Sequence, residues 1–309
     1  MWVSDFAADS SFRGGRNLVL VVGSTGALGS AIVWRLRRDG VAARALVRRT
    51  SNRAVLEGSG AEFVVGDLRD AESLLRACRG CEAVVTTASS TRRPREFDLE
   101  RIDRQGNLNL IEAAKAERVG HFVFTSSIGV DAPGAPRIFQ NKHFIEQRLA
   151  ASGLPYTVLR PGGFMENLVP LIRLVRRTGW AAIPAPGTTK TSYIAIRDVA
   201  EMVRLILAKP SQHPVIEFGG PEDLSLLDCI RVMGEVFERR VRVLRLPLKL
   251  VRAVGWAALP FTRALDAVFE IFEFVEQKGL RADRKFLEDY PIQLTSFRRF
   301  VAGQVGLSL

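Results

Sequence analysis

The chain has 309 residues, of which 47% are hydrophobic, so it can bury one large core or two smaller ones. The formal net charge is +11, but only seven of the 44 basic residues are lysines, an excess of arginine that is typical of a GC-rich genome. The arginines are scattered, and no basic stretch studded with aromatic residues occurs, so we expect no nucleic-acid partner. No run of 18 uncharged apolar residues occurs, which argues against a membrane-spanning helix.

Three cysteines occur in the sequence, at Cys78, Cys81 and Cys229. The first two form a C-x-x-C pair, a spacing found in redox motifs and in half-sites for zinc. No second pair and no histidine cluster completes a metal site, so we expect no bound metal. We interpret the cysteines as reduced thiols of a cytoplasmic protein.

The first two thirds of the chain alternate strand-like and helix-like segments. Residues 1–16 lack the pattern of a signal peptide and are interpreted as a mobile tail. The pattern then predicts strands over 17–23, 42–49, 61–68, 81–89, 121–127 and 156–162, and helices over 27–39, 70–80, 103–119 and 141–153. Continuous apolar strands separated by helices predict an α/β fold with a doubly wound parallel sheet.

After residue 163 the alternation becomes less regular. Residues 180–193 are predicted to be a loop that lines a substrate cleft, followed by helices over 197–209 and 225–239 and strands over 214–220 and 240–247. Residues 248–275 are predicted to form an amphipathic helical hairpin that packs on its own domain, with contact to a membrane surface as the alternative. We therefore expect a Rossmann core over 17–163 and a smaller, partly helical substrate lobe with sheet-completing strands over 164–309.

A glycine-rich turn joins the first predicted strand to the first helix. Its glycines, Gly23, Gly26 and Gly29, would allow a sharp turn, close approach of a pyrophosphate, and close packing of the helix on the sheet. The free N–H groups at the start of the helix favour phosphate. This turn therefore predicts dinucleotide binding, which also involves the four other residues of the turn: Ser24, Thr25, Ala27 and Leu28.

The end of the second predicted strand indicates which dinucleotide is preferred. An NAD site would have an acidic residue there to bind the ribose 2′-hydroxyl. This strand instead ends with Arg48 and Arg49, followed by Arg53, and carries no carboxylate. Because arginine suits a 2′-phosphate, NADP(H) is favoured over NAD(H).

Several motifs together resemble those of a known family. The segments "VVGSTGALGSAIVWRLRRDG", "GDLRD", "FVFTSSIG", "SGLPYTVLRPGGFMEN" and "YIAIRDVAEMV" are similar to those of atypical short-chain dehydrogenase/reductases, nearest to the NmrA-like NAD(P)-binding group with its isoflavone-reductase-like relatives. The resemblance implies that further cofactor contacts come from Asp67, Leu68, Thr87, Ala88, Ser89, Pro161, Gly162, Gly163 and Phe164. The first two would border the adenine, the next three the middle of the cofactor, and the last four the nicotinamide.

The resemblance also indicates where catalytic groups would lie. Typical short-chain reductases use a Tyr-x-x-x-Lys motif and a serine on the preceding strand. Here the strand offers Ser126 and Ser127, and Lys142 matches the lysine, but Ile138 occupies the tyrosine position. In one interpretation Lys142 contacts the cofactor and itself positions or protonates the substrate, as its counterpart is thought to do in the isoflavone-reductase-like branch.

Two other interpretations stay open. In the second, the proton comes from another residue of the fold: Tyr156, Tyr193, His143 or Asp131. Tyr193 follows the predicted cleft loop and is kept as a catalytic candidate, whereas His143 points about 100° away from Lys142 on a helix. In the third interpretation the protein carries out no reduction. The domain binds NADPH and signals its NADPH-bound state to a partner.

The favoured interpretation is an NADPH-dependent oxidoreductase that reduces a small apolar ketone, enone, imine or quinone-like substrate by hydride transfer. The alternatives are a redox-inactive NADPH sensor and an assembly factor or structural subunit. We expect a monomer or a homodimer. The candidates for an apolar wall of the substrate site are Phe139, Phe164, Met165 and Trp180. Asp198 is expected to cap the start of its helix.

Overall fold

A parallel sheet of seven strands organises the chain. The computed structural model describes residues 18–89, 99–184, 186–247, 264–304 and 306, so the predicted tail over 1–16 lies outside the described residues. The strands follow the order β3-β2-β1-β4-β5-β6-β9 and all pair in parallel. Their bounds are β1 Leu18–Val22, β2 Ala42–Val47, β3 Glu62–Val65, β4 Ala83–Thr86, β5 His121–Thr125, β6 Tyr156–Pro161 and β9 Val215–Phe218.

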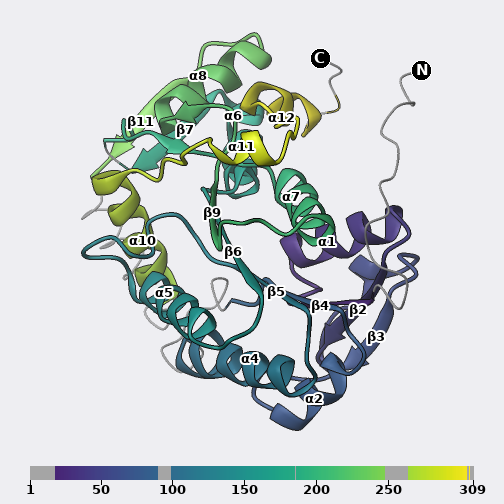
Figure 1. Ribbon diagram of the computed structural model, residues 1–309. Coiled ribbons are helices and arrows are strands. Elements are labelled where there is room, and N and C mark those ends of the chain that lie inside the picture. The colour runs from purple at the N-terminus through teal and green to yellow at the C-terminus, as the bar shows by residue number, and fades with distance from the viewer. Residues whose placement is uncertain (1–17, 90–98, 185, 248–263, 305, 307–309) are drawn as a thin grey trace.

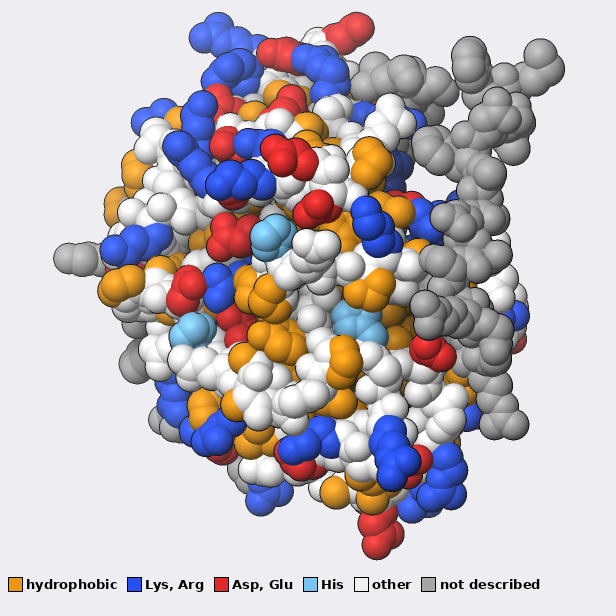
Figure 2. All heavy atoms as spheres, in the orientation of Figure 1, with side chains coloured by type: hydrophobic (Ala, Val, Ile, Leu, Met, Phe, Trp, Pro, Cys, Tyr) orange, Lys and Arg blue, Asp and Glu red, His pale blue; other side chains and the backbone are white. Residues whose placement is uncertain are grey.

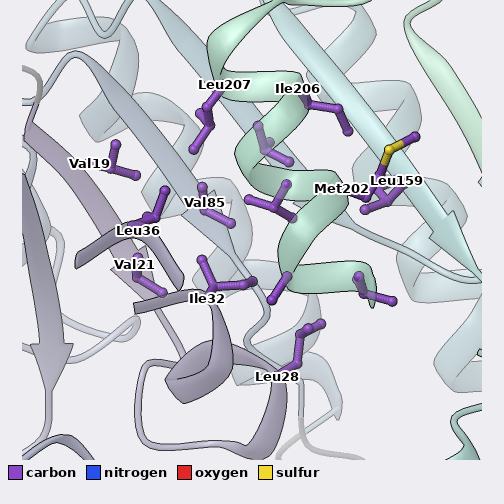
Figure 3. Close-up of a cluster of buried hydrophobic side chains, with 14 of the residues drawn as sticks. Val19, Val21, Leu28, Ile32, Leu36, Val85, Leu159, Met202, Ile206 and Leu207 are labelled. Carbon is purple, nitrogen blue, oxygen red and sulfur yellow. The ribbon is translucent and has the colours of Figure 1, made fainter. Parts of the chain in front are cut away.

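Helices cover both faces of this sheet (Figure 1). One face is covered by α1 (Ala27–Arg38) and α7 (Ile196–Ala208), and the other by α2 (Ala71–Cys78), α4 (Asn107–Ala116) and α5 (Arg137–Ala150). Side chains on the first face interlock between the helices and the sheet, as Figure 3 shows for Ile32, Leu36 and Met202 against Val21 and Val85. The predicted doubly wound parallel sheet is confirmed, because alternate strand residues enter the two separate cores.

Several elements after β6 gather above the sheet and form a third buried cluster, whereas α7 and β9 belong to the main sheet and its first face. They include α6 (Val169–Thr178), α8 (Leu226–Val236) and α12 (Phe297–Gly303), which follow the short turn η3 (Met165–Leu168). Two small sheets accompany them, one of β7 (Trp180–Pro184) with β11 (Arg242–Leu246) and one of β8 (Thr191–Ser192) with β10 (Asp223–Leu224). The remaining short elements are η1 (Ala54–Leu56) and α11 (Phe286–Asp289).

The predicted loop over 180–193 is partly wrong. Its first five residues form β7, because Ala181 and Ile183 alternate into the third cluster and because β11 supplies a partner strand from 60 residues further along the chain. A pairing partner so distant in sequence leaves no trace in the local pattern.

Two helix predictions also need correction. The helix predicted over 103–119 is a π-helical stretch, η2 (Leu99–Gly106), followed by α4. At their junction the buried Asn107 side chain donates to the carbonyls of Ile102 and Asp103, at 3.3 and 2.9 Å, in place of the regular backbone pattern. Helix α5 begins four residues before the predicted start, directly after Pro136, which occupies the N-cap position with a non-helical ψ of 153°.

Helix α10 (Ala264–Lys278) contains the described part of the predicted hairpin, since residues 248–263 lie outside the described residues. Its Phe274 is buried and meets Phe139 edge to face, with ring centroids 5.6 Å apart. Leu280 and Ile128 complete this fourth cluster. The described half of the segment therefore packs on its own chain, over the loop that follows β5.

Candidate active site

The glycine turn between β1 and α1 has the close packing that its residue types predict. Gly23 has a φ of +80°, and a Cβ atom on it would lie 2.7 Å from Oγ1 of Thr87 at the end of β4. The Gly26 N–H donates to the Gly23 carbonyl at 2.9 Å. A Cβ atom on Gly29 would lie 2.2 Å from that same carbonyl oxygen. These approaches require glycine, and they bring the start of α1 against the sheet.

The first turn of α1 leaves backbone donors free of side-chain caps. Gly26 is the N-cap residue, and within the described part of the chain no side chain accepts from the N–H groups that follow it. Ser24 does not serve as a cap because its buried hydroxyl donates to the Leu46 carbonyl at 2.7 Å, while Leu28 packs in the core. Thr25 and Ala27 are at least partly exposed. A turn with glycines at its closest approaches, beside a helix N-terminus without a side-chain cap, fits the pyrophosphate of a dinucleotide.

The ends of β2 and β3 place basic groups beside this turn. Arg48 and Arg49 directly follow β2 and are exposed. The Ser51 N–H donates to the Arg48 carbonyl and the Arg48 N–H donates to the Ser51 hydroxyl, which closes a turn at this strand end. After β3, Asp67 accepts two hydrogen bonds from the Arg69 guanidinium, at 2.8 and 2.7 Å. These bonds hold the pKa of Asp67 below its usual value, and the positive charge of Arg48 contributes to the shift. Leu68 is buried in the core of the second face.

The carboxyl ends of β4 and β6 complete this edge of the sheet. Thr87 donates to the Val22 carbonyl at 3.3 Å, and Ala88 and Ser89 follow it. After Pro161, a Cβ atom on Gly162 would lie 2.0 Å from the Ser192 carbonyl oxygen, so β6 approaches β8 closely. Gly163 and the partly buried Phe164 continue this turn, in which Phe164 bridges to Ile194.

Lys142 of α5 contacts the carboxyl end of β5. Its ammonium donates to the Thr125 carbonyl at 2.8 Å and lies 5.5 Å from the centre of the Phe124 ring. Burial lowers the pKa of Lys142, while the negative charges of Asp103 and Glu146 oppose that shift. Among the described residues, the buried hydroxyl oxygens of Thr125 and Ser126 have no hydrogen-bond partner. A cation and unpartnered hydroxyls at the end of one strand fit a hydroxyl-rich group such as the ribose of a nucleotide.

Ser127, the second predicted strand serine, differs from Ser126. It is partly buried, and its hydroxyl donates to the Ile128 carbonyl at 3.3 Å. The structure therefore brings Lys142 and Ser126 to one strand end, and Ser127 lies one residue beyond it.

The residues considered as proton donors lie in different surroundings. Ile138, at the tyrosine position, is buried in the fourth cluster. Its hydrocarbon side chain cannot act as a proton donor. Asp131 accepts from Arg160 at 2.8 Å, and His143 lies beside Gln147 and Glu146 on α5.

The two tyrosines considered also differ from each other. Tyr156 packs on the core of the second face. Tyr193 lies with its ring against Gly163, and burial raises the pKa of its phenol. Of the alternative donors, Tyr193 is thus the one in direct contact with the turn after β6.

The model of the NmrA-like family matches residues 15–293. The chain belongs to the NmrA-like family. This assignment agrees with the motifs that the sequence presents, since the glycine turn and the ends of β4, β5 and β6 all lie within the match.

Two relatives of this NmrA-like chain have different names. It is 31% identical over 239 residues to a photosystem II assembly factor, Ycf39, from Trieres chinensis, a match that covers 77% of this chain and 74% of the relative. It is 30% identical over 258 residues to an NAD(P)H azoreductase from Xenophilus azovorans, with coverage of 82% and 86%. The relatives of this chain thus include a protein named as a reductase and one named as an assembly factor.

The fold of the NmrA-like chain is also found in solved structures. An NADPH-dependent quinone oxidoreductase from Escherichia coli, crystallised with NADPH, superimposes with a TM-score of 0.78 at 23% identity. That match covers 93% of this chain and 99% of the other. It shows a shared architecture that extends to the elements after β6.

Glu166 is a carboxylate with an interior contact that the sequence did not reveal. Its Oε1 accepts the N–H of Ile196 at 3.0 Å, and its buried Oε2 has no hydrogen-bond partner among the described residues. Burial raises the pKa of this carboxyl. Glu166 therefore caps the start of α7, although Glu166 lies outside that helix. The only sequence feature that could have indicated this role is an acidic residue within an apolar segment.

The expected capping role of Asp198 is wrong for this NmrA-like chain. The N-cap position of α7 is Ala195, and the Asp198 carboxylate accepts instead from the N–H and hydroxyl of Thr295, at 2.7 and 2.8 Å. Asp198 thus fixes the segment before α12 to α7, a contact between residues 97 apart that local sequence cannot indicate.

The other predicted side chains of the NmrA-like chain divide between core and surface. Phe139 and Met165 are buried in separate clusters, and Trp180 is 47% exposed, so these three do not form one wall. Burial raises the pKa of Cys78 to about 12 and of Cys81 to about 11, which keeps both as thiols. Within the described part of the chain no helix is long and apolar enough to cross a membrane.

Proposed function

We propose that the chain is an NADPH-dependent oxidoreductase that reduces a small apolar ketone, enone, imine or quinone-like substrate. The observation that carries this proposal is the Lys142 ammonium, held at 2.8 Å on the Thr125 carbonyl at the end of β5, where the next residue, Ser126, has a buried hydroxyl without a partner among the described residues. The azoreductase relative and the quinone oxidoreductase of the same fold support a reductase. Bound NADPH would supply a hydride to the substrate.

The residues that would hold the dinucleotide follow the carboxyl edge of the sheet. The uncapped N–H groups at the start of α1 would bind the pyrophosphate, with Gly23, Gly26 and Gly29 leaving room for it. Exposed Arg48 and Arg49 would bind a 2′-phosphate, which is why we propose NADP(H) over NAD(H). The turn from Pro161 to Phe164 would face the nicotinamide.

Lys142 would have two tasks in this account. Its ammonium, directed by the Thr125 carbonyl, would orient the ribose together with Ser126. Because burial lowers its pKa, Lys142 also releases a proton more readily than a free lysine, as protonation of a substrate oxygen or nitrogen requires. Tyr193 is the second donor we propose, since its ring lies against Gly163.

A second function has its own supporting observation. Ile138 replaces the usual proton donor, and the chain is 31% identical to an assembly factor. On this alternative the chain binds NADPH, carries out no reduction, and presents its bound state to a protein partner. For either function we propose a cytoplasmic protein that is a monomer or a homodimer.

Two measurements on the purified chain separate these functions. The first is the dissociation constant for NADPH and for NADH, and the second is NADPH oxidation with a panel of ketones, enones, imines and quinones. Binding with turnover on one class supports the reductase and identifies its substrate class. Tight binding without turnover across the panel supports the second function, an NADPH sensor that acts on a protein partner, and failure to bind either dinucleotide would overturn both.

A further inference from the structure

The small sheet of β7 and β11 exposes an apolar face. Strand residues alternate, and since Ala181 and Ile183 of β7 are buried in the third cluster, Trp180 and Ala182 point outward. The register pairs Arg242 with Trp180 and Leu244 with Ala182, so these residues of β11 share that outward side. Trp180 is 47% exposed and Leu244 is 49% exposed. We call these four residues, Trp180, Ala182, Arg242 and Leu244, the ribbon face.

Basic residues are concentrated in the segments that carry the ribbon face. The stretches 169–184 and 239–247 contain no acidic residue, although the exposed Glu238 directly precedes the second stretch. They contain seven exposed arginines: Arg173, Arg176, Arg177, Arg239, Arg240, Arg242 and Arg245. The Arg239 guanidinium donates to the Arg176 carbonyl at 2.6 Å, which joins the end of α6 to the start of β11. Glu235, a nearby carboxylate on α8, is already paired with Arg298.

Trp180 and Arg242 are pre-arranged on this surface. The Arg242 guanidinium carbon lies 5.3 Å from the centre of the Trp180 ring, so the cation covers an aromatic face. β11 pairs with β7 on one side, and among the described residues no strand pairs with its other edge. Hydrophobic and basic side chains adjoin one another at the upper left of Figure 2, where Figure 1 draws these strands.

We propose that the ribbon face docks on the surface of an anionic lipid membrane. Tryptophan is enriched at the depth of lipid headgroups, and arginines near an anionic leaflet are attracted to it. Leu244 and Ala182 offer no hydrogen bond to a nucleic-acid base or to an acidic peptide, whereas both can enter the boundary between headgroups and acyl chains. An apolar centre with a basic surround therefore favours lipid over a soluble polyanion, and the docking does not depend on the proposed reduction.

Vesicle sedimentation of the full chain tests the proposal. Vesicles of phosphatidylcholine alone are compared with vesicles that also contain phosphatidylglycerol, at low and at raised salt. We expect binding to the anionic vesicles that weakens with salt. The Arg242→Gln variant should bind roughly fivefold more weakly, and the variant Trp180→Ser/Leu244→Ser roughly tenfold or more.

Trp34 provides a matched control for the ribbon face. It is a tryptophan of similar exposure, 43%, on α1 at the main sheet. Trp34→Ser should bind vesicles as the wild type does, and circular dichroism should show that every variant is folded. Equal binding by wild type and the double variant would overturn the proposal, as would absence of binding to anionic vesicles. The chain has four tryptophans, so the contribution of Trp180 is measured as the difference in tryptophan fluorescence between the wild type and the double variant. Vesicle binding that soluble polyglutamate abolishes, with no blue shift in this difference, would also overturn the proposal and would indicate an acidic protein partner.

Discussion

Gly29 approaches the carbonyl group of Gly23 so closely that a Cβ atom on Gly29 would lie 2.2 Å from the oxygen and 2.7 Å from the carbon. Both contacts are with backbone, which cannot move aside as a flexible side chain can. The Gly29→Ala variant should therefore displace the turn, lower the free energy of unfolding by about 1–3 kcal/mol, and weaken NADPH binding. Thermal unfolding and cofactor titration measure the two effects.

Gly303 is the control for this substitution, because a Cβ atom on it would meet nothing within 4 Å. Gly303→Ala should change stability by less than about 0.5 kcal/mol and leave cofactor affinity unchanged. A Gly29→Ala variant that bound NADPH like the wild type would contradict the pyrophosphate site.

Arg48 and Arg49 should determine the preference between the two dinucleotides. A hydrogen bond to a charged group contributes about 1.5 kcal/mol or more, so Arg48→Ala and Arg49→Ala should each weaken NADPH binding about tenfold. NADH has no 2′-phosphate, and its dissociation constant should stay close to that of the wild type. Arg38→Ala, at the far end of α1, is the control for loss of an exposed arginine. Equal weakening of both dinucleotides would contradict the assignment.

A buried ion pair fixes α5 to the sheet. The Arg160 guanidinium of β6 donates to both carboxylate oxygens of Glu146, at 3.0 and 2.6 Å, and both residues are buried. Because Arg160→Met leaves the Glu146 charge unpaired in the interior, we expect a loss of about 3–5 kcal/mol in the free energy of unfolding. Arg298→Met breaks an exposed pair with Glu235 and should cost less than about 1 kcal/mol. Chemical denaturation measures the free energy of unfolding of both variants. Equal losses in the two variants would contradict this account.

His121 should make stability depend on pH. Burial lowers its pKa from 6.5 to about 4, and its Nε2 lies 3.0 Å from the Thr157 hydroxyl. Between these values the unfolded chain binds the proton and the folded chain does not, so stability falls as pH falls from 6.5 toward 4. Between pH 7 and pH 5 the loss from this group is about 2 kcal/mol.

The variant His121→Gln isolates this contribution, since glutamine cannot titrate. Its urea midpoint should change less between pH 7 and pH 5 than that of the wild type. Parallel pH dependences of the two proteins would show that His121 does not carry the effect.

The sequence predicted the parts of the molecule that depend on local pattern. The strands of the main sheet, the glycine turn and the position of Lys142 all follow from residues close together in the chain. The partly wrong or missed features depend on distant partners: β7 on β11, Glu166 on the start of α7, and Asp198 on Thr295. The packing of α10 over the loop after β5 likewise joins segments more than 100 residues apart.

The catalytic assignment was left open for a different reason. Ile138 removes the residue that would normally identify the proton donor, and hydrogen-bond geometry around Lys142 and Tyr193 cannot be deduced from their spacing. The structure adds the contact of Lys142 with the Thr125 carbonyl, and it shows that the buried hydroxyls of Thr125 and Ser126 have no partner among the described residues.

The central claim is that Lys142 acts in an NADPH-dependent reduction, and the NADPH oxidation rate of a Lys142→Met variant tests it most directly. Lys115→Met, at a lysine that pairs on the surface with Glu112, is the matched control. We predict that Lys142→Met loses at least about a hundredfold in kcat, within the usual range for removal of a general acid. It should remain folded and bind NADPH, and Lys115→Met should behave as the wild type. Turnover by Lys142→Met at the wild-type rate would contradict the claim and make Tyr193 the next residue to substitute.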